Sequence, residues 1–139
     1  MSRNAENRLR ALFQIRNQMN GKPPKGYFSL AKRLIDDSDN DCRWQAVIIV
    51  GEFIQINPSE VWKVVVKYGR SEDDDMRSAV ARVLLEHLLE YHFQTFFPKV
   101  KREAFRSPLF ADTLMRCSAF GQAKHNWQKV ERVLKQVGT

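Results

Sequence analysis

A repeat of 34 residues constrains the fold of this chain more than any other feature of its sequence. Residues 39–43, DNDCR, align with residues 73–77, DDDMR, and the same offset continues along the segment that follows. It pairs apolar positions with each other: Ala46 with Val80, Ile49 with Val83, Val50 with Leu84 and Ile54 with Leu88. A period of this length is typical of a helix–turn–helix unit, whose apolar face is covered only when neighbouring units stack. The repeat therefore predicts an all-α solenoid.

Apolar residues recur at helical spacing along almost the whole chain, and no segment reads convincingly as a strand. The acidic stretches 36–41 and 72–75 suit helix N-termini, and Pro58 and Pro108 suit first turns. These signals predict eight helices in four antiparallel pairs, at about residues 4–19, 27–36, 41–56, 58–68, 75–91, 93–106, 108–120 and 125–137. A break near Pro98 is an alternative within the sixth helix, because proline disrupts a helix interior.

The acidic and basic positions of the repeat, Asp41 with Arg43 and Asp75 with Arg77, resemble those of the HEAT-like family of α-solenoids. The resemblance covers about residues 27–105 and implies a short right-handed α–α superhelix of about eight helices. It also implies a structural role for these four side chains, which in that family tie neighbouring repeats together through the turns. The tetratricopeptide unit has the same period, but its Trp, Gly–Tyr and Ala–Phe pattern is not met here.

A narrower resemblance concerns residues 51–62, GEFIQINPSEVW. This segment is similar to a helix pair of the HEAT-like DNA glycosylases that remove alkylated bases, which are α-solenoids with a basic concave groove. The similarity covers one repeat, and the catalytic carboxylate and aromatic partners of those enzymes cannot be placed on this sequence. No catalytic residue is therefore assigned, and we expect a protein that is not an enzyme.

Charge is distributed unevenly along the chain, which has 23 Lys and Arg against 16 Asp and Glu. The net charge is +7 over residues 1–33, −6 over 34–90 and +6 over 91–139. Basic segments that flank an acidic one favour an anionic partner, either nucleic acid or an acidic protein face. The alternative is chance clustering on a solvated helical surface.

Composition and chemistry bound the remaining possibilities. With 139 residues and 43% apolar content, the chain is expected to form one soluble domain over residues 1–139. No apolar run approaches the length of a membrane-spanning helix, and residues 1–10 lack the apolar region of a secretory signal. Cys42 and Cys117 lie far apart at apolar positions, which fits packing residues in a reducing, cytoplasmic setting.

Metal and cofactor sites are not expected. His87 and Glu90 come close to an inverted zinc-protease motif, but Tyr91 stands where the second histidine is required. His87 is better interpreted as a partly buried residue that caps or packs. The acidic stretches lack the spacing of a calcium loop, and helix capping explains them better.

Candidate partner-binding residues are mostly basic. Lys99, Arg102 and Arg106 recur at i, i+3 and i+7 and share one face of their helix. Further candidates extend this basic character: Arg116, Lys129 and Arg132, with Arg43 and Trp44 near the start of the repeat. Trp44 is expected either to pack within a helix buried on two sides or to serve as an exposed aromatic anchor.

The sequence thus favours a non-enzymatic HEAT-like binding or scaffold module that presents a groove to a macromolecular partner, most simply a protein. The alternative is a nucleic-acid-binding protein related to the HEAT-like alkylated-base DNA glycosylases. A third possibility is an accessory subunit whose basic ends grip an acidic partner.

Overall fold

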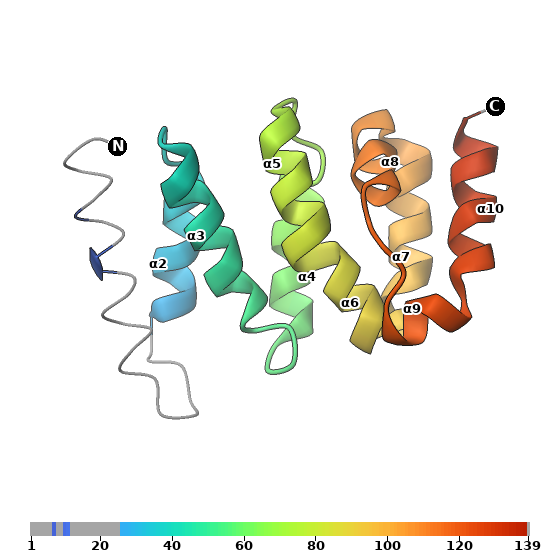
Figure 1. The fold of residues 1–139 in the computed structure, drawn as a ribbon, viewed down its shortest axis with the longest axis horizontal. Helices are drawn as coiled ribbons and strands as arrows, with labels where there is room; N and C mark the ends of the chain where they lie inside the picture. Colours follow the sequence, from blue (N-terminus) through green and yellow to red (C-terminus); the bar gives the residue numbers. More distant parts are fainter. Residues whose placement is uncertain (1–6, 8–9, 12–25, 139) are drawn as a thin grey trace. The chain divides into compact units, whose positions relative to one another are not determined.

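The computed structural model describes residues 7, 10–11 and 26–138, and every regular element within them is helical (Figure 1). The chain divides into two compact units, Met1–Phe53 and Ile54–Thr139. The helix expected at residues 4–19 lies almost entirely outside the described residues. No helix in the described part of the chain combines the length and the apolar character needed to cross a membrane.

The first unit contains a pair of helices, α2 (Tyr27–Leu34) and α3 (Asn40–Gly51). The side chain of Asp39 begins α3 by accepting a hydrogen bond of 3.0 Å from the backbone N–H of Cys42, as expected for an N-cap. The two helices pack against each other, and the ring of Phe53 contacts those of Tyr27 and Phe28. Helix α3 ends at Gly51, so the predicted extension to residue 56 is wrong.

The second unit holds the remaining elements. They are α4 (Pro58–Tyr68), α5 (Asp74–Ala79), the π-helical η1 (Val80–Leu85), α6 (Glu86–Tyr91), α7 (Phe93–Arg106), α8 (Pro108–Met115), α9 (Gly121–His125) and α10 (Trp127–Val137). Local chemistry explains their starts. Asp73 accepts from the N–H groups of Asp75 and Met76 to cap α5, and Ser107 accepts from Phe110 to cap α8. Proline occupies the first position of both α4 and α8.

These helices form two layers (Figure 1). One layer consists of the continuous helix α5–η1–α6 together with α8, and the other consists of α4 and α7, which lie behind them in the view. Helix α4 packs against η1, α7 packs against α6 and α8, and α10 closes the unit by packing against α7 and α8. Aromatic contacts join the layers, because the Trp62 ring lies 5.7 Å from that of Phe96 and 6.1 Å from that of Phe110. The all-helical fold class is confirmed.

The chain between α8 and α9 differs from the prediction. Helix α8 ends at Met115 rather than near residue 120, and residues 116–120, called the strap below, run outside any helix before α9 begins. The strap is held by the opposite helix: the N–H of Ser118 donates to Glu86 at 2.6 Å and the thiol of Cys117 to the carbonyl of Ala81 at 3.5 Å. These contacts replace helical hydrogen bonds that a longer α8 would have made.

Helix α7 continues through Pro98 without a break. The ring removes the N–H that would donate to the carbonyl of Gln94, and both residues are exposed, so water can satisfy that carbonyl. The apolar side of the helix supplies the stabilisation, since Phe93, Phe96, Val100 and Ala104 are all buried.

Candidate macromolecular interface

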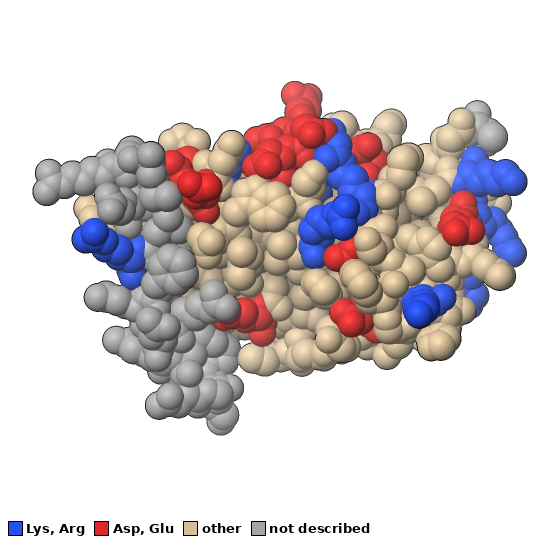
Figure 2. Space-filling model, in the orientation of Figure 1, with Lys and Arg blue, Asp and Glu red and all other residues tan. Residues whose placement is uncertain are grey.

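Folding sorts the charges of the second unit by layer. Helices α4 and α7 hold six cations and two carboxylates: Lys63, Lys67, Lys99, Lys101, Arg102 and Arg106, with Glu60 and Glu103. Together with Arg70, which lies two residues after α4 and hydrogen-bonds back to Val66, they are called the basic layer. The layer of α5–η1–α6 and α8, with Glu72 and Asp73 just before α5, is called the acidic layer: Glu72, Asp73, Asp74, Asp75, Glu86, Glu90 and Asp112, with Arg77, Arg82 and Arg116. Figure 2 shows red side chains gathered over the start of α5.

The basic row of α7 has the geometry expected from its spacing. Lys99, Arg102 and Arg106 are all exposed, on the side of the helix opposite its buried residues. Arg106 lies 3.6 Å from the carboxylate of Glu103, and the Lys99 ammonium lies 5.4 Å from the centre of the Phe96 ring. Arg102 has no ion pair or hydrogen bond with any residue that the structure describes. Two of the three cations therefore lack a carboxylate partner in the part of the chain that the structure describes.

Helix α4 adds a second set of cations that the sequence analysis did not select. Lys63, Lys67 and Arg70 are exposed, and Lys63 alone of the three has a carboxylate partner among the described residues, Glu60 at 2.9 Å. The Lys67 ammonium lies 5.1 Å from the centre of the Tyr68 ring. The Arg70 guanidinium donates to the carbonyl oxygen of Val66 at 3.0 Å, which leaves its charge uncompensated by any described carboxylate.

The two candidates on α10, Lys129 and Arg132, are exposed on the outer side of the terminal helix. Val130 and Val133 form its buried side, where α10 meets its neighbours α7 and α8. A polar outer face of this kind is typical of a helix that ends a stack. Both cations are thus available to a partner, but they lie on a different helix from the α7 row.

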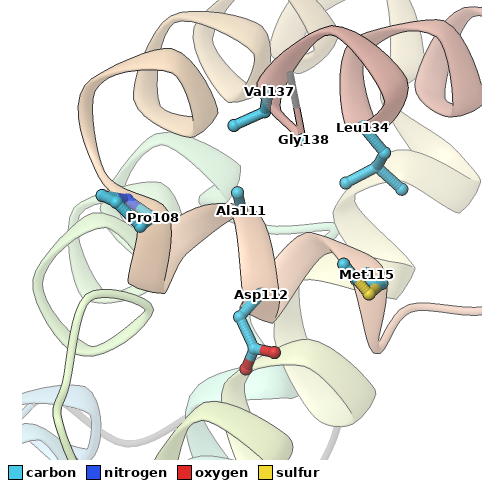
Figure 3. A pocket seen from close by; sticks show the side chains of 7 residues that line it. All are labelled: Pro108, Ala111, Asp112, Met115, Leu134, Val137 and Gly138. Carbon is cyan, nitrogen blue, oxygen red and sulfur yellow. The ribbon is translucent and has the colours of Figure 1, made fainter.

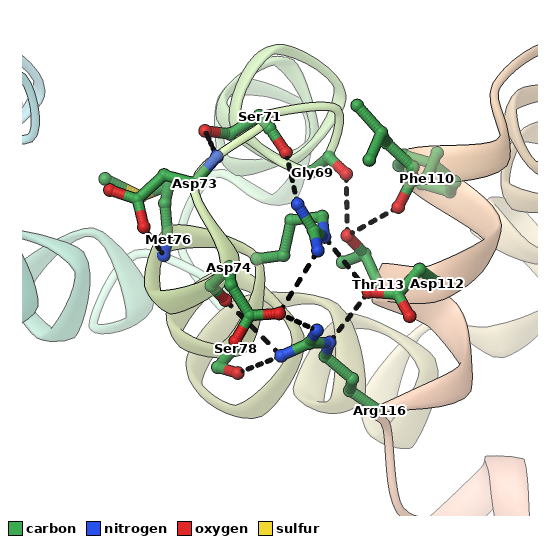
Figure 4. A network of polar contacts seen from close by, with 12 residues as sticks. Gly69, Ser71, Asp73, Asp74, Met76, Ser78, Phe110, Asp112, Thr113 and Arg116 are labelled. Atoms are coloured by element: carbon green, nitrogen blue, oxygen red, sulfur yellow. Dashed lines mark hydrogen bonds and ion pairs between the residues drawn. The ribbon is translucent and has the colours of Figure 1, made fainter.

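Arg77 lies inside the acidic layer, where its hydrogen bonds join α5 to α8. Figure 4 shows this polar network, with Asp74, Asp112 and Arg116 labelled. Its guanidinium donates from Nε to Oδ2 of Asp112 at 3.0 Å, from Nη1 to the carbonyl of Ser71 at 2.8 Å, and from Nη2 to Asp74 at 3.2 Å. Only 8% of the residue is exposed. This placement gives Arg77 contacts within α5, to the turn before it, and to α8.

Arg116 completes the same network rather than facing a partner freely. It donates from Nε to Oδ2 of Asp112 at 2.8 Å, from Nη1 to the hydroxyl of Ser78 at 2.5 Å, and from Nη2 to Asp74. Two guanidinium groups and two carboxylates therefore compensate each other on this face. The partner-binding role expected of Arg116 stays a prediction, and it would compete with these contacts.

The network shifts the pKa values of Asp74, Asp112 and Arg116. Burial opposes ionisation of Asp112, but hydrogen bonds from Arg77 and Arg116 outweigh it and hold the pKa of this carboxyl below its ordinary value. The hydrogen bond from Arg116 is the main cause of the lowered pKa of Asp74, and the reciprocal bond raises the pKa of Arg116. All of these shifts favour the charged forms, so the network is ionic at neutral pH.

The candidates near the start of the repeat belong to the first unit. Arg43 donates to the side chain of Asn40 one turn earlier on α3, and Trp44 is half-buried. Asp41 is exposed in the first turn of the same helix. Trp44 is therefore neither fully packed within the helix pair nor a fully exposed aromatic anchor, the two alternatives predicted for it.

A shallow apolar groove of about 200 Å³ lies between α8 and α10 (Figure 3). Its lining consists of Pro108, Ala111, Asp112, Met115, Leu134, Val137 and Gly138. Met115 is 64% exposed at this edge, although it is one of the largest apolar side chains of α8. The sequence did not indicate this groove, because its pattern predicted a helix that continues past Met115.

Chemically reactive side chains are engaged in packing. Burial raises the pKa of the Cys117 thiol far above its usual range, so the thiolate nucleophile is not accessible at neutral pH. His87 contacts Glu90 at 2.7 Å through Nδ1 and stacks on the ring of Phe120. Within the described ranges, no three His, Cys, Asp or Glu side chains are grouped as a metal ion would require.

The described side chains therefore offer an exposed cationic face and an apolar groove, beside a charge-compensated network. No protein-family model, no curated protein and no solved structure matches this chain. A function must accordingly be argued from the surfaces themselves.

Proposed function

We propose that this chain is a non-enzymatic binding module, built from stacked HEAT-like helical hairpins, which uses its basic layer to bind an acidic protein partner. The observation that carries the proposal is the sorting of charge. The cations of α7 are exposed and largely without carboxylate partners, whereas Arg77 and Arg116 of the acidic layer are neutralised by Asp74 and Asp112. Uncompensated cations on one face favour an anionic partner through complementary potential.

Binding explains the side chains better than catalysis does. Strongly perturbed pKa values often mark catalytic groups. Here the lowered pKa values of Asp74 and Asp112 arise from ion pairs within the fold, and the raised pKa of Cys117 arises from burial. No described nucleophile lies beside a base in a cleft, so these shifts have structural causes.

A protein partner is favoured over nucleic acid by the apolar surface close to the cations. Phe105 is half exposed on α7, three residues from Arg102, and shares the outward side of the helix with it. Arginine and aromatic side chains together are enriched at the centres of protein interfaces. Nucleic-acid interfaces rely more on polar contacts to phosphate.

The test is a fluorescence titration with poly-glutamate and with duplex DNA, each at about 50 mM and 200 mM salt. The variant is K99A/R102A/R106A, and the control R33A/K124A/K135A removes the same charge from exposed positions outside the basic layer. We expect the first triple variant to weaken poly-glutamate binding about tenfold and the control to change it little.

Three results would overturn the proposal. Equal effects of the two triple variants would mean that α7 has no special role. Release of an alkylated base from duplex DNA would make the protein an enzyme. Tighter binding of the duplex than of poly-glutamate, with a salt slope that falls by about two to three units in the α7 variant, would assign the basic layer to phosphate instead.

A further inference from the structure

We infer that α4 and α7 form one docking surface, and that its occupant is an acidic amphipathic helix of the partner lying along the seam between them. This inference rests on the proposed function and extends it, because it assigns Lys63, Lys67 and Arg70 to the interface and specifies the shape and charge pattern of the occupant.

The two helices lie side by side in the basic layer. Their rings meet near the start of each helix, where Trp62 lies 5.7 Å from Phe96. Figure 1 shows α4 and α7 running in the same direction behind the acidic layer. Because both pack against that layer through their buried sides, their exposed sides point away from it together. Exposed cations of both helices therefore share one face of the unit.

The cations form two matched rows. On α4 and the turn after it, Lys63, Lys67 and Arg70 span seven residues; on α7, Lys99, Arg102 and Arg106 span seven residues as well. A rise of about 1.5 Å per residue makes each row about 10 Å long, or two helical turns. The rings of Trp62 and Phe96 meet between the two helices, so the rows lie on either side of a seam that one further helix can cover.

Compensation within the surface is incomplete. Glu60 pairs with Lys63 and Glu103 with Arg106, one carboxylate for each row. The remaining cations of the two rows, Lys67, Arg70, Lys99 and Arg102, are without carboxylate partners among the described residues. An occupant of opposite charge would supply those partners, whereas a neutral or basic one would leave the repulsion between the rows in place.

The spacing of the cations specifies the occupant as a helix with two adjoining stripes of carboxylates, one for each row. Within each stripe the carboxylates lie at i, i+3 or i+4, and i+7. Such a helix repeats its side chains every two turns, which is the length of each row. An apolar residue at its flank would cover Phe105, which is half exposed beside Arg102. Single-stranded nucleic acid suits this surface less well, because Phe105 is its one exposed aromatic, whereas single-strand binders stack bases on several.

The experiment compares two synthetic peptides of about 21 residues and identical composition. The patterned peptide is an Ala-, Leu- and Glu-containing helix with the carboxylate stripes described above, and the scrambled peptide places the same residues without that period. Binding of the full chain is measured by fluorescence anisotropy for the unchanged protein, for K63A/K67A/R70A, for K99A/R102A/R106A and for the control R33A/K124A/K135A. Circular dichroism and melting temperature establish that each variant is folded.

We expect the patterned peptide to bind at least about tenfold more tightly than the scrambled one, and each row variant to lose about tenfold while the control loses less than about twofold. Loss in the α7 variant alone would overturn the two-row surface and leave the proposed function standing. No loss in either row variant would overturn both. Equal affinity for the two peptides would also reject the helical occupant, and tighter binding of duplex or single-stranded DNA would replace the protein partner by nucleic acid.

Discussion

Arg77 and Asp112, which are 35 residues apart in sequence, join α5 to α8. Nε of the arginine donates a hydrogen bond of 3.0 Å to Oδ2 of the aspartate. The same oxygen accepts a second hydrogen bond, from Nε of Arg116 at 2.8 Å. One carboxylate oxygen thus links the start of the long helix α5–η1–α6 to α8 and to Arg116 just after its end. Removal of any member leaves the others with uncompensated charge.

The first prediction concerns Arg77→Ala. We expect the free energy of unfolding to fall by about 2–3 kcal/mol, because the change deletes three hydrogen bonds from a mostly buried guanidinium and leaves Asp112 with one fewer partner. Urea denaturation measures the loss. The exposed Arg82→Ala is the matched control and should change stability by less than about 0.5 kcal/mol. Poly-glutamate affinity per folded molecule should not change, and a selective loss of affinity would place Arg77 in the interface.

The second prediction concerns pH. The pKa of Asp112 is lower in the folded than in the unfolded protein, so its contribution to stability is fully present above the unfolded pKa of about 4. The contribution is lost as pH falls from the unfolded pKa through the lower pKa of the folded protein, because the unfolded carboxylate takes up its proton first. Asp112→Asn should therefore flatten the acid side of the stability curve. Equilibrium unfolding at stepped pH tests this, and an unchanged acid slope would mean that the ion pairs contribute nothing.

The third prediction concerns the turn into α9. Gly121 has a φ of +51°, and a Cβ there would lie 2.8 Å from the carbonyl oxygen of Glu90. Gly121→Ala should cost about 1–3 kcal/mol, since both backbone conformation and space are unsuitable. Gly138→Ala is the control, because a Cβ there would meet its nearest atom at an ordinary 3.5 Å. Similar melting temperatures for the two variants would contradict the strap geometry.

The fourth prediction concerns the core. Leu84 has no exposed surface, so Leu84→Ala should cost about 2–5 kcal/mol through lost burial and the cavity that remains. Thermal and chemical unfolding give the value, with the exposed Gln128→Ala as a variant of near-zero cost. A cost as small as that of the control would remove Leu84 from the core and weaken the repeat alignment that pairs it with Val50.

Local chemistry made the helix starts predictable. Asp39, Asp73 and Ser107 cap helices within three residues of their own positions, so a sequence reader can recognise them. The Arg116 contact with Asp74 spans 42 residues and depends on how α8 lies against α5. Such a pair has no local signature in the sequence. Arg116 was therefore predicted to bind a partner, together with the exposed cations.

The basic layer illustrates the same limit for charge. The segment of residues 34–90 has a net charge of −6, although it contains Lys63, Lys67 and Arg70. Folding separates them from their acidic sequence neighbours, because α4 and α5 enter different layers. Net charge summed along the chain therefore indicates the basic row of α7 but not that of α4.

The π-helical segment has a signature in the sequence, which is a spacing of four between its apolar residues. Met76, Val80, Leu84 and Leu88 are all buried at intervals of four. In a regular α-helix each such interval rotates by about 40° beyond a full turn, so the buried stripe would drift round the helix. The wider turns of Val80–Leu85 reduce the drift and keep the stripe facing the core.

The separation of basic and acidic layers also gives the second unit an electric dipole directed through its thickness. A dipolar surface turns an approaching anionic partner before contact, so the layers influence the rate of productive encounter as well as the stability of the complex. The acidic layer would repel that partner at long range while the basic layer attracts it. Orientation during approach would then be lost at high salt before affinity disappears, since screening acts first on charges separated by more than about 8–10 Å.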